Sequence, residues 1–349
     1  MRVGMAFGAG AFQTGVERYA RRIIPAVQRQ GIDAVEVKLA RREVKLFGRP
    51  VGGMLTLWWD RATFPRGDWD LLHALDPAVA TRRTDVVTVH DILIETHPGL
   101  IAATRAERLD WAVTRSLAKR ARWFLCMSAF TRDAVVKHWG VSPERCVVAY
   151  SGIDPDFFRP EPSPTPLLAP GKLNLAYVGD DHPRKNLLLT LQAMRELRER
   201  HGVESRFVRF GPTRFPAMRE RAHAYAREHG LDLVEPGFVD DVTLRAVLSG
   251  CDAFVWPSLA EGFGLPPIEA MACGAKVAAL DIDVTREVCG DRALYHSNDP
   301  VDAAACYAKL RDTPWSRERQ REWALRYSWE ANARKVVGVY EKALAEGRR

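Results

Sequence analysis

Residues 257–274 read P-S-L-A-E-G-F-G-L-P-P-I-E-A-M-A-C-G and indicate the fold of this part of the chain. Residues 252–256, just before them, form a short apolar run of strand length. Gly262 and Gly264 then interrupt the pattern, and two prolines stand in the first turn of a helix predicted over residues 268–273, where proline is tolerated. A strand therefore delivers a loop to the N-terminus of a helix. In open α/β sheets ligands bind at such points, because unpaired backbone N–H groups and the positive end of the helix dipole attract an anion.

Two carboxylates, Glu261 and Glu269, flank this loop. Glu261 precedes the turn and Glu269 lies in the first turn of the predicted helix, so both can face one cleft. A carboxylate beside a bound anion would be repelled, and each is therefore expected to accept hydrogen bonds from neutral hydroxyl groups, such as those of a sugar and a ribose. Each also has a simpler interpretation, because the helix dipole favours an acid near a helix N-terminus and a loop acid is commonly solvated.

The string E-G-F-G-L-P-P-I-E-A-M-A-C-G resembles, almost letter for letter, the signature of the retaining, nucleotide-sugar-dependent glycosyltransferases of family 4, which have the GT-B fold. The resemblance implies that Glu261 contacts the donor sugar and acts in catalysis, and that Glu269 contacts the ribose of the donor. It also implies that the loop between them binds the donor, through Gly262, Phe263, Gly264 and Leu265. The scheme that the family implies requires no metal.

The length of 349 residues suits two domains, since single hydrophobic cores stop growing near about 250 to 300 residues. Predicted strands and helices alternate in both halves of the chain, which favours two doubly wound α/β domains. A Pro-rich segment separates the halves and is typical of a linker. The resemblance adds the GT-B arrangement, in which two Rossmann-like domains face each other across a cleft and a C-terminal helix crosses back to the first domain. The predicted divisions are an N-terminal acceptor-side domain over 1–160, a linker over 161–172, a nucleotide-sugar-binding domain over 173–325 and a returning helix over 326–349.

The composition is that of an ordinary soluble globular protein, with 47% hydrophobic and 27% charged residues. The longest apolar runs are shorter than the ~20 residues that a membrane span needs, and the N-terminus enters a predicted strand without the pattern of a signal peptide. The six cysteines lack C-x-x-C spacing. The sequence therefore predicts a reduced, cytoplasmic protein without a metal site.

The net charge of +7 comes from the first half of the chain. Residues 1–160 hold 24 Lys and Arg against 17 Asp and Glu, and the two kinds are balanced in the remainder. Such asymmetry indicates an acidic partner. Nucleic acid is not expected, because no helix-turn-helix, zinc-finger or aromatic RNA-binding signature accompanies the charge. Residues 38–66 mix cations with apolar residues, which is typical of a segment that lies on an anionic membrane surface, although a solvated cationic helix followed by a core element also fits this pattern.

The first half contributes two candidate site residues. Gly15 lies in the loop G-A-G-A-F-Q-T-G after a predicted strand, and the run T-G-V-E-R resembles the G-G-V-E-R form whose backbone amides approach the donor in family 4. His90 ends the apolar strand of V-V-T-V-H-D-I, and the resemblance implies that it contacts the donor sugar and is needed for activity. A tight turn and a structural histidine are the alternatives. The glycine spacing does not match the dinucleotide motif G-x-G-x-x-G, so a dehydrogenase is not favoured.

The second half contributes two cations and two apolar residues. The motif G-D-D-H-P-R-K-N places Arg184 and Lys185 just before a predicted helix, where two cations are unfavourable unless an anion joins them. The resemblance makes that anion the diphosphate of the donor, although Asp180 stands where many relatives have an arginine. It also makes Phe238 and Val239 candidates for the pocket that holds the base of the nucleotide.

The resemblance carried by these motifs implies a retaining, metal-independent glycosyltransferase that moves a hexose from a nucleotide-diphosphate sugar to a glycan or lipid-linked acceptor in the synthesis of surface polysaccharide such as lipopolysaccharide. The forms G-V-E-R-Y, V-H-D and P-R-K-N look most like those of bacterial mannosyltransferases, which favours GDP-mannose over UDP-sugars as donor. We expect the protein in the cytoplasm, bound peripherally at the inner face of the plasma membrane. A sugar-nucleotide epimerase, a phosphorylase and a non-catalytic assembly subunit of the same architecture are the alternatives.

Overall fold

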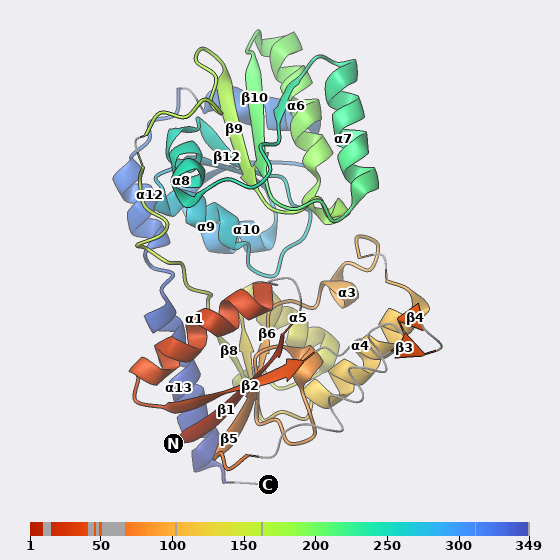
Figure 1. The fold of residues 1–349 in the computed structure, drawn as a ribbon, viewed down its shortest axis with the longest axis vertical. Helices are drawn as coiled ribbons and strands as arrows, with labels where there is room; N and C mark the ends of the chain where they lie inside the picture. Colours follow the sequence, from red (N-terminus) through yellow and green to blue (C-terminus); the bar gives the residue numbers. More distant parts are fainter. Residues whose placement is uncertain are drawn as a thin grey trace. The chain divides into compact units, whose positions relative to one another are not determined.

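The computed structural model describes residues 1–9, 15–40, 45–46, 49–50, 67–101, 103–161, 163–310 and 312–347. They form two compact units: Met1–Gly152 together with Ser328–Arg349, and Ile153–Tyr327. Each unit contains a six-stranded parallel sheet with helices packed on it (Figure 1). This confirms the prediction of two doubly wound, Rossmann-like domains.

The first unit is built on a sheet with the strand order β2-β1-β5-β6-β7-β8. Its strands are β1 (Arg2–Ala9), β2 (Asp33–Ala40), β5 (Leu71–Ala74), β6 (Val86–Val89), β7 (Trp123–Cys126) and β8 (Cys146–Val148), with a separate short pair, β3 (Lys45–Leu46) and β4 (Arg49–Pro50). Its helices are α1 (Gly15–Arg29), η1 (Pro77–Val79), α3 (Leu93–Thr96), α4 (Arg105–Ala118), α5 (Ala129–Trp139), η2 (Pro143–Arg145) and α13 (Trp329–Ala345).

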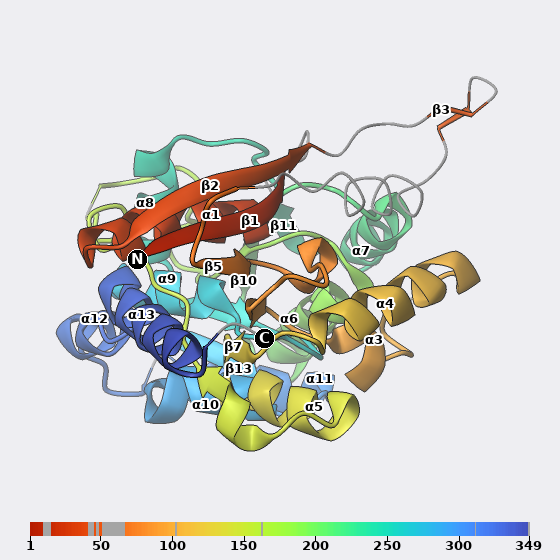
Figure 2. The ribbon, with the colours of Figure 1, turned by 90° about the horizontal axis from the view of Figure 1, so that it is seen from below.

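The sequence explains how these elements begin and why the sheet is buried. Strands β6 and β7 are buried along their whole length, and their nearly continuous apolar sequences are those of parallel strands covered on both faces. Ser128 caps α5 by accepting a hydrogen bond from Thr131 N, as its position in the sequence predicts. The C-terminal helix α13 packs against α1 and against β6, β7 and β8. Figures 1 and 2 show α13, in blue, beside the red elements from the start of the chain.

The second unit has the strand order β11-β10-β9-β12-β13-β14. Its strands are β9 (Leu173–Val178), β10 (Ser205–Phe210), β11 (Asp232–Val234), β12 (Ala253–Trp256), β13 (Val277–Leu280) and β14 (Ala293–His296). Its helices are η3 (Pro183–Lys185), α6 (Leu187–His201), α7 (Pro216–Glu228), α8 (Asp241–Gly250), α9 (Leu265–Ala272), α10 (Asp283–Cys289), η4 (Gly290–Arg292), α11 (Pro300–Lys309) and α12 (Arg317–Ala324).

The order of these strands determines where the candidate site lies. From β9 the chain moves outward through β10 to β11, and it then returns to pair β12 with the other side of β9. The loops that follow β9 and β12 therefore emerge side by side at the carboxyl ends of adjacent strands, which is the topological switch point of an open α/β sheet. The loop after β9 carries Arg184 and Lys185, and the loop after β12 carries Glu261.

Helix α9 begins earlier than its sequence indicates. The predicted helix covers residues 268–273, whereas the structure places α9 at Leu265–Ala272, with both prolines inside its first turn. The reason is that the first N–H groups of a helix have no partner within the helix, so two prolines there forfeit no hydrogen bond. The shift brings the helix N-terminus directly against the glycine turn.

The Pro-rich segment belongs to the second unit. Glu161 Oε2 lies 3.5 Å from Arg245 Nη2, and Asn174 Oδ1 accepts a hydrogen bond of 2.7 Å from Ala169 N. The chain passes between the units at residues 152–153 and again at residues 327–328. Across the described parts of the chain, the helices are all too short or too polar to span a bilayer.

Candidate active site

Three charged side chains meet where the loops after β9 and β12 lie together. The Nζ of Lys185 is 2.5 Å from Oε1 of Glu261, and the Nη1 of Arg184 is 2.7 Å from Oε2 of the same carboxylate. Arg184 Nη1 also donates to Ala260 O at 2.8 Å, and the backbone O of Arg184 accepts from Leu259 N at 2.8 Å. The structure thus joins the two motifs that the sequence singled out separately. We refer to Arg184, Lys185 and Glu261 as the charged cluster.

The charged cluster lies on an aromatic floor. Lys185 and Glu261 are buried, with 7% and 6% of their surfaces exposed. The Lys185 ammonium is 4.3 Å from the ring centroid of Trp256, the last residue of β12, and Tyr177 stacks on the same indole with a centroid separation of 5.4 Å. Little water can screen charges in such a place, so the ion pairs are stronger than exposed ones.

Burial and neighbouring charge act on the carboxylate in opposite directions. Burial raises the pKa of Glu261, but the charges of Lys185 and Arg184, with the hydrogen bond from Lys185 and the hydroxyl of Ser258, outweigh it and hold that pKa below its ordinary value. Burial lowers the pKa of Lys185, and the carboxylate of Glu261 opposes that effect. With Glu261 ionised and Lys185 protonated, the cluster carries one net positive charge and attracts an anion.

This arrangement differs from the expectation for Glu261. The sequence analysis gave it neutral hydroxyl partners, on the ground that a bound anion would repel a carboxylate. In the structure two cations neutralise it instead, and Glu261 is itself an anion that Arg184 and Lys185 require at their position before α6. Each motif supplies the counter-charge of the other, and this pairing cannot be seen when the motifs are considered one at a time.

The glycine turn gives α9 its position beside the cluster. Gly264 is the N-terminal cap of α9 and has a φ of +86°, a left-handed conformation that glycine adopts without a steric penalty. A Cβ atom at this position would lie 3.6 Å from Nε1 of Trp256 and 4.0 Å from Cγ of Glu261. The turn therefore packs directly on the two residues that hold Lys185, and the N-terminus of α9 begins there.

The remaining residues of the signature are mostly buried around this turn. Gly262 and Phe263 are buried, and the ring of Phe263 packs edge-on against Tyr327 at a centroid separation of 5.6 Å. Leu265 is half-buried, and Glu269 is buried within α9 with 8% of its surface exposed. These four residues, together with Gly264, thus lie on one loop and the helix that it begins.

The two candidates for the base pocket are more open. Phe238 is fully exposed and Val239 is half-buried, and both follow Gly237, whose φ is +75°. They lie in the connection between β11 and α8, at the edge of the sheet where the carboxyl ends of β9 and β10 also lie. Asp180, at the position of the common arginine, has a different local role, because its Oδ1 accepts from His182 N at 3.3 Å and its Oδ2 lies 3.8 Å from Arg214.

The first unit holds the other two candidates. His90 follows β6, and its Nε2 lies 2.9 Å from the carbonyl oxygen of Leu75. A carbonyl only accepts, so Nε2 carries the hydrogen and Nδ1 of the neutral ring is an acceptor. The ring of Tyr19 packs edge-on against His90 at a centroid separation of 5.0 Å. Gly15 is the first residue of α1, and the preceding residues 10–14 of the glycine loop lie outside the described part of the chain.

Three residues of the site were missed by sequence reasoning. Trp256 and Tyr177 sit in strands whose apolar sequence reads as core, and Ser258 reads as part of a loop. Ser258 is fully buried, and its hydroxyl helps to lower the pKa of Glu261. One feature of the sequence indicates the aromatic floor of the charged cluster: Trp256 stands directly before the P-S of the signature. Within the ranges that the structure describes, His, Cys, Asp and Glu side chains nowhere gather in a group of three that could hold a metal ion.

Comparisons with known proteins identify the family of this chain. Residues 13–157 match the family described as Glycosyltransferase Family 4, and residues 172–312 match the family described as Glycosyl transferases group 1. The chain is 28% identical over 278 residues to the O-antigen chain mannosyltransferase B of Escherichia coli, an alignment that covers 73% of this chain and 70% of that protein. The chain belongs to the family 4 glycosyltransferases.

Further relatives of this glycosyltransferase support the assignment. It is 27% identical over 310 residues to the MMP alpha-(1->4)-mannosyltransferase of Mycolicibacterium hassiacum, with 80% of this chain and 72% of that protein covered. The solved structure of sucrose-phosphate synthase from Thermosynechococcus elongatus matches with a TM-score of 0.77 and 18% identity, over 99% of this chain and 100% of that one. The similarity to sucrose-phosphate synthase concerns the fold alone. The family resemblance that the sequence motifs indicated is confirmed.

Proposed function

We propose that this glycosyltransferase takes a hexose from a nucleotide-diphosphate sugar and transfers it with retention of configuration at the anomeric carbon, without a metal ion. The observation that carries the proposal is the charged cluster beside the N-terminus of α9. A diphosphate at this point would meet a net positive charge and the N–H groups of the first helical turn, and charge-assisted hydrogen bonds of this kind are among the strongest in proteins.

In the proposed reaction the bond between the anomeric carbon and the diphosphate oxygen breaks, and a bond from the acceptor oxygen to the same carbon forms on the same face. The proton of the acceptor hydroxyl passes to the departing phosphate oxygen. Negative charge develops on the diphosphate as it leaves, and Lys185, Arg184 and the amides at Gly264 and Leu265 would stabilise it. Positioning of the donor and this electrostatic stabilisation account for catalysis in the scheme.

Glu261 would serve both the protein and the donor. The Lys185 ammonium has three N–H donors, so it can bond to Glu261 and to a phosphate oxygen together. Each carboxylate oxygen of Glu261 has more than one lone pair, so it can accept from a sugar hydroxyl while it remains paired with a cation. We assign Glu261 to the donor sugar and Glu269, further along α9, to the hydroxyls of the ribose.

His90 and the glycine loop would complete the contacts to the donor. The His90 ring is held by Leu75 O through Nε2, which leaves Nδ1 for a hydrogen bond with a hydroxyl of the donor sugar. Gly15 would allow the backbone of the first loop to approach the donor closely, because a side chain is absent there. Phe238 and Val239 are proposed to contact the base.

The donor is proposed to be GDP-mannose, and the acceptor a glycan or a lipid-linked saccharide of a surface polysaccharide. The motifs of the sequence and two relatives that are named mannosyltransferases support the sugar. The charge excess of the first half supports an anionic acceptor or membrane surface at the inner face of the plasma membrane. Most of residues 38–66, which carry that argument further, lie outside the described residues.

Nucleotide release tests the proposed reaction. The purified protein is incubated with GDP-mannose, UDP-glucose or UDP-N-acetylglucosamine, with and without saccharide acceptors, and the nucleoside diphosphate is measured. We expect acceptor-dependent release of GDP. Tighter binding of UDP than of GDP would overturn the choice of base, and an absence of release from every donor would overturn the reaction itself.

A further inference from the structure

A further cation lies near the charged cluster, on the loop that follows β10. This loop, residues 211–215, leads into α7 and carries Arg214. Strand β10 pairs with β9 in parallel, so the loops after the two strands emerge next to each other at the carboxyl edge of the sheet. Arg214 therefore lies at the same edge of the sheet as Arg184 and Lys185.

The two loops are in backbone contact where they begin. Gly211 has a φ of +133°, and a Cβ atom there would collide with the carbonyl oxygen of Gly179, so only glycine fits at this point. The backbone N of Gly179 in turn donates to Phe210 O at 2.9 Å. The start of the loop that carries Arg214 is thus packed against the residue that precedes Asp180.

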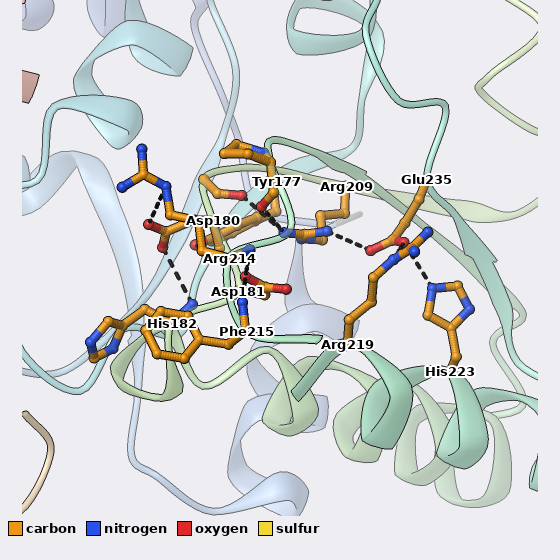
Figure 3. A network of polar contacts seen from close by, with 12 residues as sticks. Tyr177, Asp180, Asp181, His182, Arg209, Arg214, Phe215, Arg219, His223 and Glu235 are labelled. Atoms are coloured by element: carbon orange, nitrogen blue, oxygen red, sulfur yellow. Dashed lines mark hydrogen bonds and ion pairs between the residues drawn. The ribbon is translucent and has the colours of Figure 1, made fainter. Parts of the chain in front are cut away.

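Asp181 holds the other end of this loop. Its Oδ1 accepts hydrogen bonds from the backbone N of Arg214 at 2.6 Å and of Phe215 at 2.9 Å, as Figure 3 shows. The ring of Phe215 packs edge-on against His182 at a centroid separation of 4.6 Å. Asp181 is buried, with 2% of its surface exposed, so water does not compete for these hydrogen bonds. The backbone at Arg214 is therefore held in place, and its side chain extends from a fixed point.

The guanidinium of Arg214 is accessible and only loosely paired. Its Nε lies 3.8 Å from Oδ2 of Asp180, and half of the Arg214 side chain is exposed (Figure 3). That separation is too long for a hydrogen bond, so Asp180 balances the charge of the guanidinium without using its N–H donors. These donors suit a phosphate group, which guanidinium binds through two parallel hydrogen bonds.

Asp180 connects this arginine with the charged cluster. The hydroxyl of Tyr177 donates to the carbonyl oxygen of Asp180 at 3.3 Å, and the same ring stacks on Trp256, which contacts Lys185. Although burial lowers the pKa of Lys185, the charge of Asp180 is one of those that raise it, so this carboxylate acts on the cluster. Asp180 by itself would weaken the attraction of the cluster for an anion, and Arg214 supplies its counter-charge.

We propose that Arg214 is a further donor-binding residue, whose guanidinium contacts the diphosphate of the nucleotide sugar together with Lys185. This inference rests on the proposed function of the charged cluster. Asp180 holds Arg214 at the edge of the cluster, and Arg214 exchanges its long ion pair for hydrogen bonds to phosphate oxygens when the donor binds. The loop after β10 thus adds a third cation to the two that the loop after β9 provides.

Titration calorimetry with GDP on the full chain tests this role. Arg214→Gln removes the charge but keeps the backbone N–H that Asp181 accepts, and its affinity for GDP should fall about tenfold, the lower end of the range for a hydrogen bond to a charged group. UDP should show the same loss, since both nucleotides carry the diphosphate. The matched control is Arg227→Gln in the last turn of α7, which also removes a positive charge from an exposed ion pair, that with Glu220, and should leave the affinity unchanged.

Asp180→Asn separates a direct contact from a change of local charge. The amide keeps an oxygen for the backbone N–H of His182 and removes the negative charge, so GDP should bind about two- to fivefold more tightly, as expected for exposed charges. In this background Arg214→Gln should still weaken GDP binding about tenfold, because the contact to the phosphate is lost whether or not residue 180 is charged.

Unchanged affinity in a folded Arg214→Gln variant would overturn the inference, and urea unfolding shows whether the variant is folded. A loss that disappears in the Asp180→Asn background, or that affects only one of the two nucleotides, would also overturn it. Binding of GDP that Lys185→Ala weakens and Arg214→Gln leaves unchanged contradicts the role of Arg214 alone. A wild-type protein that binds neither nucleotide contradicts the proposed function as well.

Discussion

Replacement of Lys185 by alanine tests how the charged cluster recognises the donor. The substitution removes a buried ammonium that lies 2.5 Å from Glu261 and 4.3 Å from the centre of the Trp256 ring. A charge-assisted hydrogen bond to the diphosphate is worth about 1.5 to 3 kcal/mol, so the affinity for GDP should fall by about 10- to 150-fold. Without Lys185 the cluster also changes from a net positive charge to a neutral Arg184–Glu261 pair, which removes its attraction for an anion.

Titration calorimetry with GDP measures this effect. A urea unfolding curve for each variant shows whether that variant is folded under the conditions of the titration. Lys172→Ala is a matched control, because Lys172 forms an ion pair of similar length, 2.7 Å, with Asp232 in the same unit but outside the charged cluster. Its affinity for GDP should equal that of the wild type. An unchanged affinity in Lys185→Ala, with the protein folded, would refute the assignment of Lys185 to the diphosphate.

Three other predictions concern separate parts of the molecule. Glu261→Gln should mainly lower turnover through the donor sugar, and Glu269→Gln should mainly weaken nucleotide binding through the ribose; identical kcat and KM profiles would contradict this division. Burial raises the pKa of Glu235, but hydrogen bonds from His223, Arg219 and Arg209, with the charge of Arg209, lower it from 4.5 to about 2. The contribution of Glu235 to the free energy of unfolding is therefore complete above about pH 4.5 and disappears as the pH falls towards 2. Urea unfolding should therefore show a stability loss in Glu235→Gln near neutral pH that shrinks on acidification, and a constant difference would be inconsistent with the ion network. Co-sedimentation with anionic vesicles at low ionic strength should be lost when Arg41, Arg42 and Lys45 are replaced by alanine. Binding that persists in this variant would assign residues 38–66 to the core and the solvated surface.

The fold was predictable because it depends on patterns that are local in the sequence. Apolar runs such as 86–89 and 253–256 have the length and composition of buried parallel strands, and each is followed by a loop and a helix. The cap at Ser128 and the turn at Gly264 follow from residue type alone. The start of α9 was misplaced by three residues, since prolines permit a helix to begin before them as well as at them.

The contacts between the side chains of the site were less predictable. Lys185 and Glu261 are 76 residues apart, and their pairing depends on the packing of two loops at the switch point between β9 and β12. The role of Trp256 depends on the same packing, because an indole in a buried strand has the pattern of any core residue. The buried Asp181 reads as an ordinary loop acid in the sequence, and only the structure shows that its carboxylate accepts hydrogen bonds from the backbone N of Arg214 and of Phe215 (Figure 3).

The most direct test of the central claim is the nature of the product formed from GDP-mannose. Proton nuclear magnetic resonance of the reaction mixture reports both the release of GDP and the configuration at the anomeric carbon of the transferred sugar. The proposed mechanism predicts that each GDP released is matched by one mannoside with the α configuration of the donor, and that Lys185→Ala slows its formation. A β product, or GDP release without any mannoside, would contradict it.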